Sequence, residues 1–403
     1  MPRRFFLLLA GVVGSGTALA LVLAAVTDGD PYDMQSLRLV HGVLHADFLG
    51  LYEHHAVANR WPYPPGFLPW VSASGWLADA TGISFEFIVR LASILANAAI
   101  ALVVQDFLGR QGAGARSRLI AAGLVCLGPA FLVISGYHGQ IDAVAILPAV
   151  LALHRWQYAP AGRRALEAGL LVGLGGAMKS VPLLMVVALA PSARSRRELA
   201  TLLGAAAVPL VVAFLPFAVA GALPDLQRLA YRGIPGAGGL SLVVQPELPQ
   251  AYLGIRGLSP SGLTRALTEQ GSLVVAASLL AVGYVGAKTR AAAPQLAVLL
   301  WLVVFAFGVN FFFQYALWGL PFLLMAGLLR VVAVAQAVLA LAMAIFYLRP
   351  WDEPAIGWAY SVLMLGLWAA VAVGSAAVAV RLLRGGRVRG DLTRAARDSV
   401  ATS

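Results

Sequence analysis

The segment LEAGLLVGLGGAMKSVPLLMVVALAP, from Leu166 to Pro191, is an apolar run with one lysine, Lys179, in its middle. Arginines flank this run on both sides: Arg155, Arg163 and Arg164 before it, and Arg194, Arg196 and Arg197 after it. Arginine-rich loops of membrane proteins lie in the cytoplasm, so both flanks are predicted to lie there. A run that begins and ends on one side must turn back. Its glycines and proline predict a short helical hairpin (166–191) with Lys179 at the tip.

Lys179 is an unusual residue for such a place. The only other lysine of the chain, Lys288, lies at a predicted helix end, where its charge costs little. An ammonium group within a membrane is costly unless it meets an anion or water. We therefore predict that Lys179 binds an anion, and a phosphate is its natural ligand.

The composition is that of a polytopic membrane protein. Of 403 residues, 60% are hydrophobic and 12% are charged, and the mean hydropathy is +0.82, whereas soluble domains carry about 25% charged residues. The net charge of +11 comes mainly from arginines in short loops, without a basic stripe between exposed aromatics, so no nucleic-acid partner is expected. The single cysteine, Cys126, excludes an internal disulfide and a CxxC site.

The first apolar segment, Phe5 to Val26, follows Arg3 and Arg4 and is long enough to cross a bilayer. It is longer than the apolar part of a signal peptide, so we interpret it as a retained helix with a cytoplasmic N-terminus. From this helix onwards, successive apolar segments are expected to cross the membrane in alternating directions. This gives an all-α, polytopic fold of about 11 to 13 membrane segments and a cytoplasmic C-terminus. The Ala, Gly and Arg bias favours a bacterial protein, and hence the inner (plasma) membrane.

We predict one integral membrane domain, 1–403, with a basic cytoplasmic tail at 383–403. Two long loops then lie outside, at 27–84 and 223–271. Both are rich in Pro, Gly and aromatic residues and are expected to contain short helices on the membrane surface, together with lipid contacts.

Three carboxylates follow the first helix: Asp28, Asp30 and Asp33. A carboxylate within reach of a substrate hydroxyl can act as a general base. Alternatively, Asp30 before Pro31 is a good N-cap, which makes Asp30 structural and leaves Asp33 for chemistry. Asp33 is the leading candidate for the base, and Asp30 follows.

Other polar residues of the first loop have competing interpretations. The prolines of Trp61 to Gly66 fix an extended path that forms either a wall of a substrate groove or a stiff lead into a surface helix. A metal at Glu53, His54 and His55 is not expected. A divalent cation at Asp28 and Asp30 is an alternative, but we predict no metal and no cofactor.

The turn Gly136 to Asp142 is predicted to face the same side as the acidic cluster. Its candidate substrate-binding residues are His138, Gln140 and Asp142. Amide and carboxylate groups match the vicinal hydroxyls of sugars, although they also cap helices.

Two further groups of candidates lie later in the chain. In the second loop, Tyr231 and Arg232 follow Arg228, and external arginines indicate either anion binding or contact with lipid headgroups. Near a later helix entry, Gln314 and Tyr315 lie among phenylalanines, which is also typical of an interfacial aromatic belt.

Together these motifs resemble the GT-C glycosyltransferase superfamily, in particular its bacterial mannosyltransferase-like members. In chain order the matching motifs are YDMQS (32–36), YPP (63–65), HGQID (138–142), GLLVGLGGAMKSVPLL (169–184), LAYRG (229–233) and QYALWGLPF (314–322). The resemblance implies a polyprenyl-phosphate sugar donor and inversion at the sugar. It also implies an aspartate base, Asp33 or Asp30, and a donor phosphate held by Lys179 and Arg232.

The resemblance thus implies a membrane transferase of mannose or another hexose or pentose. It implies an acceptor outside the cytoplasm that is a lipid, glycan or protein, and contacts of Gln140 and Asp142 with the sugar or the acceptor. The alternative is a transporter or flippase of lipid-linked sugars, which predicts charged groups along a path from both faces.

Overall fold

The computed structural model describes residues 3–57, 60–224, 233–348 and 353–384, which are helical with no strand among them. Seven helical stretches in these ranges are long and apolar enough to cross a membrane. They are α1 (Arg3–Val26), α4 (Phe85–Arg110), Ala115–His138, α10 (Arg196–Val219), α15 (Gly271–Thr289), α18 (Leu329–Leu348) and α19 (Pro354–Leu383). The prediction of an all-α polytopic membrane protein is therefore confirmed.

The stretch Ala115–His138 comprises α5 (Ala115–Cys126), α6 (Pro129–Leu132) and the π-helical turn η3 (Val133–His138). The other predicted membrane segments coincide with shorter helices. These are α7 (Asp142–Tyr158), α8 (Arg164–Met178), η4 (Val181–Leu184), α9 (Met185–Leu189), η5 (Ala190–Ser192), α16 (Ala293–Phe307) and α17 (Ala316–Met325).

Both predicted external loops contain short helices. The first loop holds α2 (Pro31–Ala46), η1 (Leu49–Tyr52), η2 (Pro65–Phe67) and α3 (Leu68–Thr81). The second holds α12 (Leu240–Val244), α13 (Pro249–Tyr252) and α14 (Gly262–Glu269). The predicted basic tail falls almost entirely outside the described residues, and the predicted domain boundaries stay predictions.

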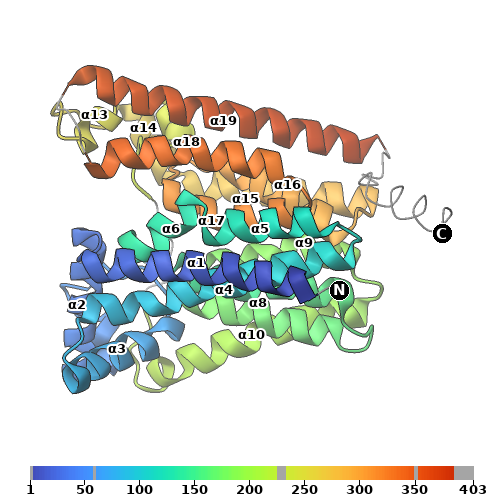
Figure 1. Cartoon of the computed structure of the whole chain (residues 1–403), viewed down its shortest axis with the longest axis horizontal. Helices are drawn as coiled ribbons and strands as arrows, with labels where there is room; N and C mark the ends of the chain where they lie inside the picture. Colours follow the sequence, from blue (N-terminus) through green and yellow to red (C-terminus); the bar gives the residue numbers. More distant parts are fainter. Residues whose placement is uncertain (1–2, 58–59, 225–232, 349–352, 385–403) are drawn as a thin grey trace. The chain divides into compact units, whose positions relative to one another are not determined.

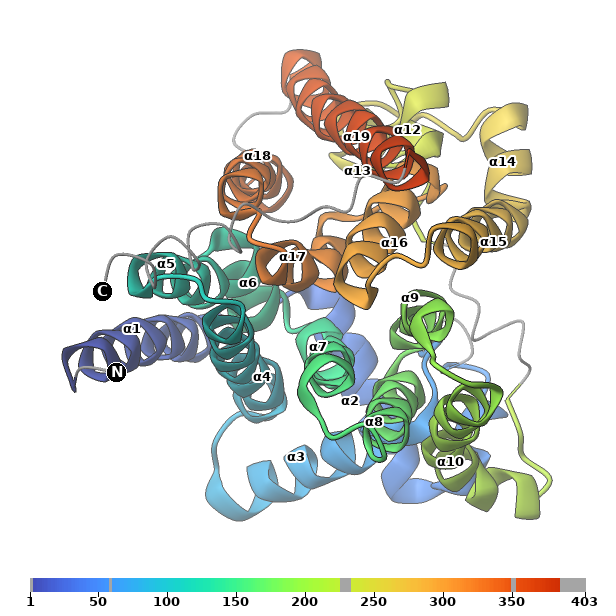
Figure 2. The same cartoon turned by 90° about the vertical axis from the view of Figure 1, so that its right-hand side faces the viewer.

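The chain forms two compact units. The first comprises Met1–Gln105, Leu119–Val186 and Ala193–Tyr231, and the second comprises Asp106–Arg118, Val187–Ser192 and Arg232–Ser403. In the first unit, α1, α8 and α10 run along the long axis of Figure 1. Figure 2 shows α8 and α10 nearly end-on and α3 lengthwise, so α3 lies across the bundle that carries the site. In the second unit, α18 and α19 run side by side, and η6 (Phe313–Tyr315) leads into α17.

Small residues let α8 and α10 pack with their backbones close together. A Cβ atom on Gly169 would lie 2.5 Å from the carbonyl oxygen of Leu202, and one on Gly173 would lie 2.2 Å from that of Ala206. Two glycines four residues apart form the small-residue face on which membrane helices meet. This packing fixes α8, the helix that ends at Lys179.

We expect Gly173→Ala to lower the free energy of unfolding by about 1–3 kcal/mol, because its methyl group overpacks the contact with α10. The matched control is Gly204→Ala on α10, where an added Cβ meets no atom within 4 Å. That variant should gain roughly 0.5–1 kcal/mol from helix propensity. Thermal unfolding in detergent measures both changes, and equal effects of the two variants would contradict this account of the packing.

Candidate active site

The acidic turn after α1 is organised by Asp30. Its side chain caps α2: Oδ1 accepts hydrogen bonds from the backbone N–H groups of Tyr32 at 3.1 Å and Asp33 at 3.2 Å. Pro31 occupies the first helical position, where its lack of an N–H costs nothing. The interpretation of Asp30 as an N-cap is thus confirmed. Asp28 interacts electrostatically with Arg38 and Arg90.

Asp33 lies in the first turn of α2 and is the centre of a polar cluster. Its Oδ2 pairs with Nε2 of His138 and accepts a hydrogen bond from Nε2 of Gln140 at 2.6 Å. His138 is buried, whereas Asp33 keeps part of its side chain exposed. The carboxylate is therefore fixed on one side and accessible on the other, as a general base requires.

An irregular turn brings His138 and Gln140 to Asp33. The π-helical turn η3 ends at Gly139, which has a φ of +86° that favours glycine. Gln140 follows, and α7 begins at Asp142. Such π-helical turns are frequent at functional sites because they re-aim the side chains that they carry.

Lys179 joins the same cluster from α8. Its Nζ donates to Oδ1 of Asp142 at 2.7 Å, and the two side chains are 6% and 0% exposed. Asp142 begins α7 and Lys179 caps the end of α8, so the pair joins the adjacent ends of two packed helices. Lys179 thus has an anionic partner within the protein.

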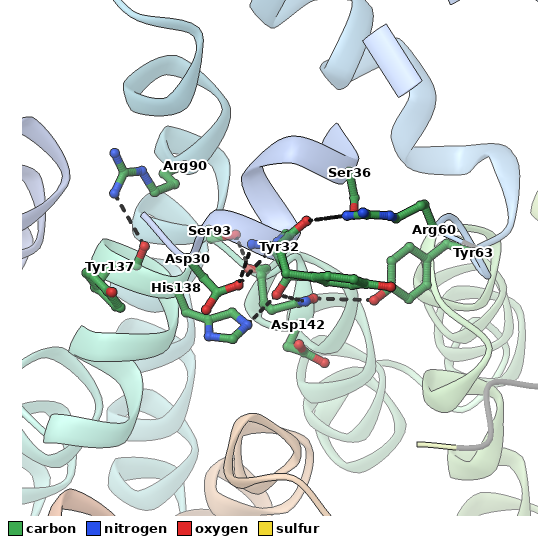
Figure 3. Close-up of polar contacts among 12 residues, drawn as sticks. Asp30, Tyr32, Ser36, Arg60, Tyr63, Arg90, Ser93, Tyr137, His138 and Asp142 are labelled. Atoms are coloured by element: carbon green, nitrogen blue, oxygen red, sulfur yellow. Dashed lines mark hydrogen bonds and ion pairs between the residues drawn. The ribbon is translucent and has the colours of Figure 1, made fainter. Parts of the chain in front are cut away.

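The proline-rich segment of the first loop reaches both parts of the cluster. The hydroxyl of Tyr63 lies 3.4 Å from Oε1 of Gln140, and its ring centroid lies 5.0 Å from Nζ of Lys179. Gly66 allows this approach, because a Cβ there would lie 2.5 Å from the carbonyl oxygen of Ala177. Through Trp61 and Tyr63 the segment also lines a small pocket with Asp33, Ser36, Leu37, Arg60, Gly139, Gln140 and Ile141. Figure 3 labels Ser36, Arg60 and Tyr63 of this group. This arrangement fits the predicted groove wall.

Opposing effects act on the pKa of Asp33. Burial raises it, but the charge and hydrogen bond of His138, the hydrogen bond of Gln140 and the charge of Lys179 together hold it below the ordinary value of 3.8. Asp33 is therefore ionised at neutral pH, so it is ready to accept a proton.

Three residues of the site have the spacing of a metal-binding group. The ligand atoms of Asp30, Asp33 and His138 all lie within 4.8 Å of one another, and no other such group occurs among the described residues. Glu53, His54 and His55 therefore do not form one there. The expectation that the protein needs no metal stays a prediction.

The remaining candidates are elsewhere in the chain. Tyr231 and Arg232, with Arg228, lie outside the described residues. Gln314 and Tyr315 are buried in η6 of the second unit, where the ring of Tyr315 stacks on Trp318 at 4.2 Å between centroids. Their roles stay predictions.

Sequence reasoning missed two arginines beside the site. Arg90 is buried within α4, and Arg60 lines the small pocket with its guanidinium 4.3 Å from the ring centroid of Tyr32. The signal for Arg90 was present in the sequence. A lone arginine inside the apolar segment of α4 is as costly as the lone lysine Lys179.

The protein is a polytopic helical membrane protein with a polar cluster centred on the carboxylate of Asp33. The chain belongs to glycosyltransferase family 87, whose family model matches residues 61–313, more than half of its length. It is thus a membrane glycosyltransferase. The match includes His138, Gln140, Asp142 and Lys179 but begins after Asp33. No curated protein matches the chain with significant similarity.

Proposed function

We propose that this glycosyltransferase takes its sugar from a polyprenyl-phosphate donor and transfers it, with inversion, to a hydroxyl of an acceptor. One observation carries the proposal. The carboxylate of Asp33, on a helix outside the long membrane spans, shares a cluster with Lys179, which closes a helix within the apolar part of the chain. A base for the acceptor and a cation for an anionic leaving group are thus close together.

In the proposed reaction, Asp33 removes the proton from the acceptor hydroxyl as its oxygen attacks the anomeric carbon. The bond from this carbon to the phosphate oxygen breaks on the opposite face, and its electrons leave with the lipid phosphate. The sugar passes through an oxocarbenium-like transition state. A fixed cation in a low-dielectric site stabilises the negative charge that develops on the leaving group.

Lys179 is the cation that we assign to the donor phosphate. Lys179 already donates to Asp142. An ammonium group carries three N–H donors, so this bond does not by itself exclude a phosphate oxygen. In this assignment Asp142 holds the ammonium in place, while Gln140 and Tyr63 line the route to Asp33.

We assign the site to the extracytoplasmic face of a bacterial inner membrane, with both termini in the cytoplasm, because the arginine-rich loops predict this orientation. The donor sugar is mannose or a related hexose or pentose, and the acceptor is a lipid, glycan or protein. Family membership favours this transferase over a transporter of lipid-linked sugars.

The direct test incubates purified protein with a panel of polyprenyl-phosphate sugars and an extract of membrane glycolipids as acceptors. Release of polyprenyl phosphate from one donor, together with a new glycosylated product, is the expected result. Nucleotide sugars form the matched control panel. Product from a nucleotide sugar, with no polyprenyl phosphate released from any lipid donor, would overturn the proposal.

The acid limb of the pH profile tests the role of Asp33. Because its folded pKa is depressed, the carboxylate should remain a base until the pH falls below its ordinary value of 3.8. His138→Gln removes a positive charge beside Asp33, so the pKa should rise and the acid limb of kcat/KM should move upward by about one pH unit. His45→Gln, at an exposed position of α2, is the control. Superimposable profiles for all three proteins would contradict the assignment.

The depressed pKa of Asp33 also affects the stability of the fold. A depressed carboxylate pKa stabilises the fold above the unfolded-state pKa, and this contribution is lost as the pH falls through the folded-state pKa. Unfolding of the His138→Gln variant should therefore become acid-sensitive at a higher pH than unfolding of the wild-type protein.

A further inference from the structure

We propose that Arg90 is the positioning residue of this active site: it joins the end of α1 to the π-helical turn and thereby holds Asp33 against His138. The proposal rests on the proposed function for its catalytic consequence. The structural part stands on the contacts of Arg90 alone.

Arg90 is 1% exposed, and all three nitrogens of its guanidinium donate hydrogen bonds. Nε donates to the carbonyl of Glu86 at 2.7 Å, within α4. Nη1 donates to Oγ1 of Thr27 at 3.1 Å and to the carbonyls of Gly136 at 3.0 Å and Tyr137 at 3.4 Å. Nη2 donates to the carbonyls of Ala24 at 2.8 Å and Thr27 at 2.6 Å.

The acceptors of Nη1 and Nη2 belong to two helix ends. Ala24 and Thr27 lie at the end of α1, and Gly136 and Tyr137 lie at the end of η3 (Figure 3 shows Arg90 beside Tyr137). The last carbonyls of a helix have no partner within it and form its negative end. One buried cation therefore satisfies two helix ends at once. Their dipoles in turn offset the cost of its charge.

The two joined ends lead directly to the reacting groups. Asp30, which caps α2 and so places Asp33, is three residues beyond Thr27, and His138 follows Tyr137. A movement of either helix end relative to the other would separate Asp33 from His138 and Gln140. Arg90 thus acts through these residues and has no direct role in chemistry.

Other polar residues of α4 support the same turn. Oγ of Ser93 donates to the carbonyl of Gln140 at 2.7 Å, and Nδ2 of Asn97 donates to Oγ of Ser135 at 2.9 Å. Arg90, Ser93 and Asn97 are spaced by three and four residues, so they lie on one face of α4. This polar face satisfies backbone groups that the irregular turn leaves without a regular helical partner.

Arg90→Lys tests the proposal, because lysine keeps the charge but lacks the planar fork that binds two helix ends. With the polyprenyl-phosphate sugar identified in the donor screen, kcat should fall about 100-fold, since displacing a catalytic group by about 1 Å costs this much. The donor KM should stay within about twofold, since no donor contact is lost. The acid limb of the pH profile should move upward because His138 is released from Asp33.

The matched control is Arg164→Lys. Arg164 is also a buried arginine of the first unit, but its guanidinium pairs with Glu198 on α10. This variant should lower stability and leave the pH profile of the folded enzyme unchanged.

A milder test variant, Thr27→Val, removes one acceptor of Arg90 and should lower kcat by about three- to tenfold with a normal folded yield.

Hydrogen–deuterium exchange tests the positioning role of Arg90 independently of the glycosyl transfer reaction. In Arg90→Lys, faster exchange should be confined to residues 27–36 and 133–141, and this holds whichever donor the enzyme uses. Exchange that is unchanged, or raised across the whole first unit, would contradict the positioning role of Arg90. A wild-type kcat and pH profile in both Arg90→Lys and Thr27→Val would overturn it as well. A wild-type enzyme that uses no lipid-linked donor would instead overturn the proposed function.

Discussion

Asp33→Asn is expected to lower kcat by about 10²- to 10⁴-fold, the contribution of a well-placed general base. Asparagine is nearly the same size and its oxygen still accepts the hydrogen bond from Gln140, but its amide cannot take a proton from the acceptor. The folded yield should be unchanged. Single-turnover measurement of sugar transfer with saturating donor isolates the chemical step.

Asp30→Asn is the matched control for this prediction. Asparagine caps a helix as well as aspartate does, so α2 should begin in the same place and transfer should stay within a few-fold of wild type. Asp30→Ala loses the cap and should cost about 1 kcal/mol of stability. If Asp30→Asn abolished transfer while Asp33→Asn preserved it, Asp30 would be the base.

Lys179→Met is expected to have the second large effect, on folding as well as on donor use. Removing one partner of a buried ion pair leaves the other charge uncompensated and costs about 3–5 kcal/mol. Asp142 is fully buried, so the single variant should fold poorly. Its low activity would then say little about the donor phosphate.

The double variant Lys179→Met with Asp142→Leu separates the two effects. An apolar pair of similar size often replaces a buried ion pair without loss of stability, so folding should return towards the wild-type level. The kcat/KM for the donor should remain about 10- to 100-fold lower, the value of one charge-assisted hydrogen bond. Asp142→Asn keeps a hydrogen-bond acceptor but removes the buried counter-charge of Lys179, so this single variant should fold poorly as well. Wild-type donor kinetics in the double variant would remove Lys179 from the phosphate site.

Apolar runs and arginine-rich loops made the helical membrane fold predictable, because the bilayer imposes both patterns on a sequence. Costly or unusual polar residues identified much of the cluster as well. Asp33, His138, Gln140, Asp142 and Lys179 were all candidates, and the structure places them in one network.

The pairing within that network was not predictable from the sequence. Asp142 and Lys179 are 37 residues apart, and Asp33 and Gln140 are 107 apart, so helix packing alone decides which groups meet. The π-helical turn also escaped prediction, since one extra backbone residue in a turn has no sequence pattern of its own. The partners of Arg90 were not predictable either, because they are backbone carbonyl groups, which every residue carries.

The ion pair between Asp142 and Lys179 also bears on how the protein enters the membrane during synthesis. Either charge alone would oppose transfer of its helix from the insertion machinery into lipid. Partitioned together as an antiparallel pair, α7 and α8 present a neutral salt bridge instead. We therefore expect the insertion machinery to release α7 and α8 into the bilayer together.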